Sequence, residues 1–130
     1  DRTAAELDLA GTFQDEASEG LGGIPRWKGQ LGLQWSNRRW RGNYEMHFIS
    51  AMEELVPGSM RQRDIESWMI HDVQLSYNFK WLKGLRWAIG VDNVLDREAP
   101  LATSAFNDSI DGRTHELKGR FLYTKLSQRF

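Results

Sequence analysis

The feature that most constrains this chain is the alternation of apolar and polar side chains along residues 27–36, 40–49, 69–79 and 85–92. One parity carries no formally charged side chain: Trp27, Gly29, Leu31, Leu33, Trp35, Trp40, Gly42, Tyr44, Met46, Phe48, Met69, His71, Val73, Leu75, Tyr77, Phe79, Leu85, Trp87, Ile89 and Val91. The other parity carries the charges Lys28, Arg41, Glu45, Asp72, Arg86 and Asp92, with Gln30, Gln34, Asn43, Gln74, Ser76 and Asn78 between them. Successive side chains of a β-strand point to opposite faces, so the pattern predicts strands with one apolar and one hydrated face.

Rings on the apolar parity recur at a fixed spacing. The pairs Trp27 and Trp35, Trp40 and Phe48, and His71 and Phe79 are each eight residues apart. Eight residues span about 26 Å of strand, or roughly 20 Å of height at a tilt of about 40°, close to the apolar band of about 25 Å in membrane barrels. A soluble β-sandwich core also accounts for many aromatics, but it gives no reason to repeat this spacing. We therefore expect lipid to cover the apolar face.

The chain is predicted to be all-β, an antiparallel up-and-down meander of about six strands. The expected strands are residues 4–13, 26–36, 40–50, 68–79, 85–93 and 114–130. The connections alternate between long (14–25, 51–66, 94–113) and short (37–39, 81–84). A helix is the alternative structure for residues 51–56, and Pro57 would limit its length. Long outer loops and short periplasmic turns are typical of bacterial outer-membrane barrels. This arrangement places Trp35, Trp40, Phe79, Trp81 and Phe130 at one rim.

Length and composition narrow the alternatives. The length of 130 residues suits one domain, and a net charge of -1 gives no electrostatic reason to bind nucleic acid. The mean hydropathy of -0.59 and the lack of any long apolar run exclude a membrane helix, which needs about 20 apolar residues. They do not exclude barrel strands, whose hydropathy averages out. Single-chain barrels start at about eight strands, and an open sheet in lipid leaves unpaired edges. Because Asp1 also begins without a signal peptide, we expect residues 1–130 to be the last part of a larger barrel.

Three stretches carry a family resemblance. They are His71–Phe79 (HDVQLSYNF), Gly90–Asp96 (GVDNVLD) with Pro100 soon after, and Gly119–Phe130 (GRFLYTKLSQRF), while Ile24–Trp27 (IPRW) fits the same pattern. In this order and spacing they resemble the carboxy-terminal strands of TonB-dependent outer-membrane receptors. Val94-Leu95 replaces the usual Leu-Phe. The outward-facing residues of the last strand are less apolar than usual, with Gln128 where an aromatic is common.

The resemblance implies a fold and a set of partners. It implies a 22-stranded barrel around a plug domain that residues 1–130 do not contain, with energy delivered by the TonB complex through that plug. It further implies a place in the outer membrane of a Gram-negative bacterium, contact with lipid, and a barrel-assembly machinery that reads the terminal strand ending in Phe130. The implied function is uptake of a scarce nutrient, most often a ferric siderophore, with cobalamin, haem and oligosaccharides as family alternatives. Neither chemistry nor a cofactor is implied. Two other classes stay open, a soluble all-β binding module and a fragment of a passive porin-like barrel.

The expected site residues follow from these two faces. The lipid face and girdle are assigned to Trp27, Trp35, Trp40, Tyr44, Phe48, Tyr77, Phe79 and Trp87. The lumen wall, in contact with the plug before substrate, is assigned to Lys28, Arg41, Glu45, Asp72, Arg86 and Asp92. Substrate recognition is expected in the loops at 51–66, where Arg61 and Arg63 could attract an anion, and at 101–113.

The remaining polar candidates are read as structural. His47 is expected in the lumen, His71 at the lipid interface and His115 on the last strand, so no metal-binding cluster is predicted. Asp92 and Asp96 are expected to form a turn and not a catalytic pair. Arg120 is expected to snorkel at the outer interface.

Overall fold

The computed structural model describes residues 10–14, 22–55, 61–103, 109–110 and 114–129. The chain forms two compact units, each considered by itself below. The first comprises residues 1–28, 49–67 and 99–116, and the second residues 29–48, 68–98 and 117–130. The described part of the chain holds no helix of the length and apolarity that a membrane crossing requires.

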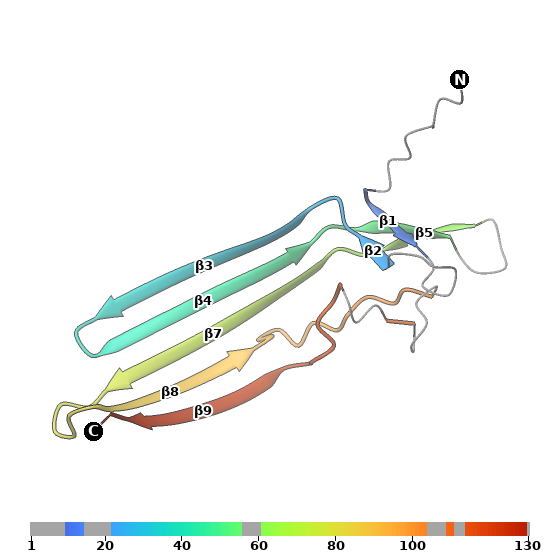
Figure 1. Ribbon diagram of the computed structural model, residues 1–130. Coiled ribbons are helices and arrows are strands. Elements are labelled where there is room, and N and C mark those ends of the chain that lie inside the picture. The colour runs from blue at the N-terminus through green and yellow to red at the C-terminus, as the bar shows by residue number, and fades with distance from the viewer. Residues whose placement is uncertain (1–9, 15–21, 56–60, 104–108, 111–113, 130) are drawn as a thin grey trace. The chain divides into compact units, whose positions relative to one another are not determined.

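The second unit is built on a five-stranded sheet (Figure 1). Its order is β3-β4-β7-β8-β9, so strands that follow one another within the sheet are also neighbours in space. The bounds are β3 Lys28–Asn37, β4 Trp40–Ile49, β7 Trp68–Asn78, β8 Leu85–Asp92 and β9 Phe121–Gln128. The pairs β7–β8 and β8–β9 are antiparallel, as predicted for a meander.

The register of β7, β8 and β9 places residues of the same parity opposite one another. Tyr77 pairs with Trp87, which pairs with Leu126. On the other parity Gln74 pairs with Gly90, which pairs with Tyr123. Because directly opposed residues share a face, this sheet has one apolar face and one polar face, as the alternation predicted.

The first unit carries a smaller sheet of order β2-β1-β5-β6. Its strands are β1 Thr12–Gln14, β2 Gly22–Ile24, β5 Met52–Leu55 and β6 Gln62–Ile65. Its core cluster is Phe13, Met52, Ile65 and Ala102, each at most 5% exposed. Met52 and Ile65 face each other across β5 and β6, which explains why this short hairpin forms.

Several predicted boundaries were wrong. The loop at 14–25 contains β2, and the loop at 51–66 contains β5 and β6, so the rival helix over 51–56 is a strand at Met52–Leu55. Residues 4–9 of the predicted first strand lie outside the described residues. Strand β1 pairs with β5 in parallel, which departs from the antiparallel meander. The last strand begins at Phe121 and not at residue 114.

The late start of β9 follows from a side-chain contact with another segment of the chain. The backbone N–H of Arg120 donates to the Oδ1 of Asp96 at 2.8 Å, so a side chain occupies the donor that a strand would use for its ladder. Two residues before Arg120, the Lys118 ammonium lies 3.6 Å above the centre of the Phe121 ring. Side-chain contacts therefore fix this segment where the sequence predicted strand.

Candidate functional site

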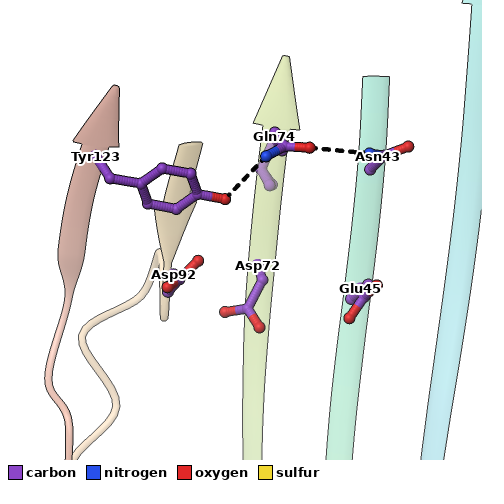
Figure 2. A pocket seen from close by; sticks show the side chains of 7 residues that line it. Asn43, Glu45, Asp72, Gln74, Asp92 and Tyr123 are labelled. Atoms are coloured by element: carbon purple, nitrogen blue, oxygen red, sulfur yellow. Dashed lines mark hydrogen bonds between the residues drawn. The ribbon is translucent and has the colours of Figure 1, made fainter. Parts of the chain in front are cut away.

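The polar face of the five-stranded sheet carries a hydrogen-bonded row across β4, β7 and β9 (Figure 2). The Asn43 Nδ2 donates to the Gln74 Oε1 at 3.1 Å, and the Gln74 Nε2 donates to the Tyr123 hydroxyl at 3.2 Å. The Tyr123 side chain crosses β8 at Gly90, where a Cβ would lie 2.8 Å from the ring Cε1 and still closer to Cζ and the hydroxyl. A side chain at position 90 would therefore displace the ring, so Gly90 is needed for this row to form.

A row of carboxylates lies next to it, towards the end of the sheet from which the long connections leave (Figure 2). Glu45, Asp72 and Asp92 line a hollow of about 240 Å³ together with Asn43, Val73, Gln74 and Tyr123. The His47 Nε2 lies 3.7 Å from the Glu45 Oε2 and 3.5 Å from the Asp72 Oδ2. His47 therefore lies beside two carboxylates of the polar face, and its place in the lumen stays a prediction.

The opposite end of the polar face carries cations. The Arg86 Nη2 donates to the Ser76 Oγ at 2.9 Å, and the Ser76 Oγ lies 3.4 Å from the carbonyl oxygen of Arg41, to which it donates. Lys125 pairs with Ala88, which in turn pairs with Ser76. The predicted mixed-sign wall is therefore largely segregated. Arg41 and Arg86 lie near the short turns, the carboxylates lie near the long connections with the amides between them, and Lys28 is the exception at the start of β3.

The six residues expected at the lumen do not form one cluster. Three of them, Glu45, Asp72 and Asp92, line the same hollow. Arg41 and Arg86 belong to the cationic end, and Lys28 is exposed at the first residue of β3. Their contact with a plug or a substrate stays a prediction.

The connection that follows β8 is fixed by Asn93 and Asp96, both at positive φ (51° and 53°). The Asn93 side chain accepts from the N–H of Arg97 at 2.8 Å and donates to its carbonyl at 2.9 Å. The Asn93 N–H donates to the Asp72 Oδ1 at 2.7 Å, which ties this turn to β7.

The acidic pair at the end of β8 makes contacts that the sequence did not indicate. Asp96 lies in the turn, and its Oδ2 is 3.6 Å from the Arg120 Nη2, while Asp92 is 3.5 Å from the Lys118 Nζ. Arg120 is thus engaged with a carboxylate, which differs from the expected snorkelling. His115 is 3% exposed and precedes β9, so its predicted place on the last strand was wrong.

The apolar face exposes large side chains along every strand of the sheet. Exposed members include Leu31, Leu33, Trp35, Trp40, Met69, Val73, Leu75, Trp87, Leu122 and Leu126. Two pairs of polar groups on this face bond to each other. The Tyr44 hydroxyl lies 2.7 Å from the His71 Nδ1, and the Trp87 Nε1 donates to the Thr124 Oγ1 at 2.8 Å. Mutual satisfaction of this kind is what a face without water requires.

Three of the aromatic residues expected at the girdle gather with Trp81 near the short turns. Trp40 and Tyr77 have ring centres 4.7 Å apart, Tyr77 and Phe79 5.1 Å, and Phe79 and Trp81 6.3 Å. Trp27 is 70% exposed and Phe48 is half-buried. Contact of any of these residues with lipid stays a prediction, and Phe130 lies outside the described residues.

The expected recognition loops fall mainly in the first unit. A hollow of about 670 Å³ there includes Arg26, Glu53 and Asp64 in its lining, and Glu53 and Asp64 oppose each other across β5 and β6. The Glu54 side chain, 1% exposed, accepts from both the N–H and the hydroxyl of Thr103, which joins two of the predicted loops. Residues 56–60, 104–108 and 111–113 lie outside the described part of the chain.

Comparison with known families decides between the classes left open. The family model described as "TonB dependent receptor-like, beta-barrel" matches residues 3–94. The chain belongs to this family. Searches of curated proteins and of solved structures found no match. The TonB-dependent receptor family consists of outer-membrane receptors that transport and are not enzymes, in agreement with the resemblance of the sequence.

Sequence reasoning missed two elements of the site. Tyr123 and Gly90 were noted only as parts of a motif, although a glycine directly opposite an aromatic residue is a readable signal once the register is known. The Asn93–Arg97 turn could have been suspected from Asn93 directly after an alternating segment, because Asn tolerates positive φ better than most residues.

Proposed function

We propose that this chain forms part of the wall of a receptor that takes up a scarce, bulky nutrient across the outer membrane in a TonB-dependent manner. The observation that carries the proposal is the family match over residues 3–94. It is supported by a sheet whose exposed face is apolar and whose other face is polar, as a barrel wall between lipid and lumen requires.

We further propose that residues 1–130 are the carboxy-terminal part of the barrel and that its plug lies elsewhere in the protein. In the described ranges, nothing pairs with the outer edges of β3 and β9. Unpaired backbone groups in hydrocarbon cost several kcal/mol each, so these edges need neighbouring strands. The sorted polar face would then meet the plug, Phe130 would serve the barrel-assembly machinery, and the TonB complex would act through the plug.

For the nutrient we propose a ferric siderophore. This choice rests on the resemblance to the family, in which such chelates are the most frequent cargo. The hollow of the first unit has Arg26, Glu53 and Asp64 in its lining, and these residues supply both signs of charge for a polar chelate. Cobalamin, haem and oligosaccharides are the alternative nutrients that the experiment below must distinguish from a siderophore.

The test is uptake by intact cells. A strain that lacks the gene is compared with the parent for accumulation of radiolabelled iron from a panel of siderophores under iron limitation. Loss of uptake of one chelate, and the same loss in a TonB-deficient strain, supports the proposal. Uptake that continues without TonB points to a passive pore, and loss of cobalamin, haem or oligosaccharide uptake in place of iron rejects the siderophore.

A further inference from the structure

The end of the five-stranded sheet that carries the short turns has a one-sided charge. We call the segments 35–41, 77–87 and 125–129 the turn end. It contains eight of the 17 Lys and Arg residues of the chain and none of the 18 Asp and Glu residues. The cations are Arg38, Arg39, Arg41, Lys80, Lys83, Arg86, Lys125 and Arg129.

Backbone hydrogen bonds place the three segments side by side (Figure 1). The Asn78 N–H donates to the carbonyl of Arg39 at 2.9 Å, and the Arg129 N–H donates to the carbonyl of Gly84 at 3.0 Å. Arg41, Arg86 and Lys125 lie within strands on the polar face. The five cations outside the strands form one collar across the end of the sheet: Arg38, Arg39, Lys80, Lys83 and Arg129. No ion pair joins any of the eight to a carboxylate in the described part of the chain.

Exposed indoles accompany the collar. Trp81 is 81% exposed, Trp35 55% and Leu82 47%. A hollow of about 240 Å³ is lined by Asn37, Arg38, Arg39, Trp40 and Tyr77, so two arginines and two aromatic residues meet at one small concavity. A phosphodiester-sized anion fits such a space, and Arg is the side chain best suited to bind it with two hydrogen bonds.

We propose that the turn end binds the headgroups of anionic phospholipids. Trp and Tyr favour the boundary between water and hydrocarbon, where one end of the ring is apolar and the other is hydrated. Lys and Arg beside them gain from the negative potential of an anionic leaflet. An acidic protein would satisfy the charges but would not call for the exposed Trp81 and Leu82, so the observations favour lipid.

This inference rests on the proposed function, since it needs the sheet to lie in a membrane. The experiment uses the full receptor with Leu82→Cys as its single labelled cysteine. Residues 1–130 contain no cysteine, so only cysteines elsewhere in the receptor need to be replaced. The protein is inserted into phosphatidylcholine vesicles that contain increasing fractions of brominated phosphatidylglycerol or, in parallel, brominated phosphatidylcholine. Bromine quenches the label only at close range.

We expect quenching by the anionic lipid at several-fold lower mole fraction than by the neutral lipid, with the preference weakening in high salt. The variant Lys80→Gln/Lys83→Gln removes two exposed charges of one turn. At about five-fold per basic residue, the loss of two charges is enough to abolish a several-fold preference. The matched control Lys28→Gln/Arg63→Gln removes two exposed charges outside the turn end and should leave the preference unchanged.

The outcomes separate the two proposals. No quenching by either lipid would mean that the turn end is not at a membrane, which contradicts the proposed function itself. Equal quenching by both lipids, unaffected by Lys80→Gln/Lys83→Gln, would agree with a sheet in the membrane. It would overturn the proposal that the turn end binds anionic headgroups. Relief of the quenching by millimolar inorganic phosphate or by an acidic peptide would mean that the turn end prefers that ligand to the lipid headgroup. Either result would also overturn the proposal that the turn end binds anionic lipid.

Discussion

The variant Gly90→Ala should destabilise the sheet through one identifiable collision. The Tyr123 ring lies over Gly90, so a new Cβ would lie 2.8 Å from its Cε1 and nearer still to Cζ and the hydroxyl. The ring must then move, which breaks the hydrogen bond that the hydroxyl accepts from Gln74 at 3.2 Å.

The expected magnitude is the sum of three effects. Overpacking costs about 1–3 kcal/mol, and loss of the hydrogen bond about 0.5–1.5 kcal/mol. Replacing a strand glycine with alanine returns about 0.5–1 kcal/mol, because the unfolded chain loses freedom. We expect a net loss of about 0.5–4 kcal/mol in the free energy of unfolding.

The assay is urea unfolding of the receptor in lipid vesicles, followed by tryptophan fluorescence. The matched control is Gly32→Ala in β3, where a Cβ would meet no atom within 4 Å, so that only the favourable entropic effect remains. In Gly90→Ala/Tyr123→Ala the collision disappears, so alanine at position 90 should cost far less than in the presence of Tyr123. If Gly90→Ala and Gly32→Ala are equally harmless, the packing of Tyr123 on Gly90 is refuted.

Two further substitutions test the turns by the same unfolding assay. Gly84→Ala should lower the free energy of unfolding by about 2–4 kcal/mol, because Gly84 has a φ of +83°. A Cβ there would also overlap the carbonyl oxygen of Arg129 and lie 3.2 Å from its carbon. An unchanged urea midpoint would contradict this turn geometry. Asn93→Ala should cost about 2–4 kcal/mol through the two lost hydrogen bonds to Arg97 and the positive φ, and Asn93→Gly about 1 kcal/mol less, because glycine tolerates that φ. Equal losses for the two Asn93 variants would show that the backbone conformation contributes nothing.

The long strands could be predicted because each has one uniform environment per face. In β8 every second residue from Leu85 to Val91 is apolar, and the structure gives a strand with nearly the predicted bounds. The same holds for β3, β4 and β7. Periodicity reports burial or lipid contact, so it is informative where a face is long and continuous.

The short strands could not be predicted, because their stabilising contacts are made with distant segments. Two adjacent acidic residues dominate β5, yet Glu54 is buried and accepts two hydrogen bonds from Thr103, 49 positions along the chain. Similarly, the break before β9 depends on Asp96, which belongs to a different segment. Local composition carries no information on such partners.

The polar face was predicted residue by residue but not in its order. Alternation places Glu45 and Arg41 on the same parity, and only the register shows that the cations collect near the short turns. Register depends on the pairing of strands, which a single sequence leaves open.

The central claim, that lipid covers the apolar face, is tested most directly by cysteine scanning along β7 and β8. Single cysteines are introduced into the receptor in its membrane at Val73, Leu75 and Ile89 on the apolar face and at Gln74 on the polar face. Each carries a small fluorophore, and quenching by brominated acyl chains is measured against quenching by aqueous iodide. Strong bromine quenching at the three apolar-face positions, with Gln74 insensitive to bromine, is the predicted result. Labels at Val73, Leu75 and Ile89 that iodide quenches and bromine does not would contradict the account.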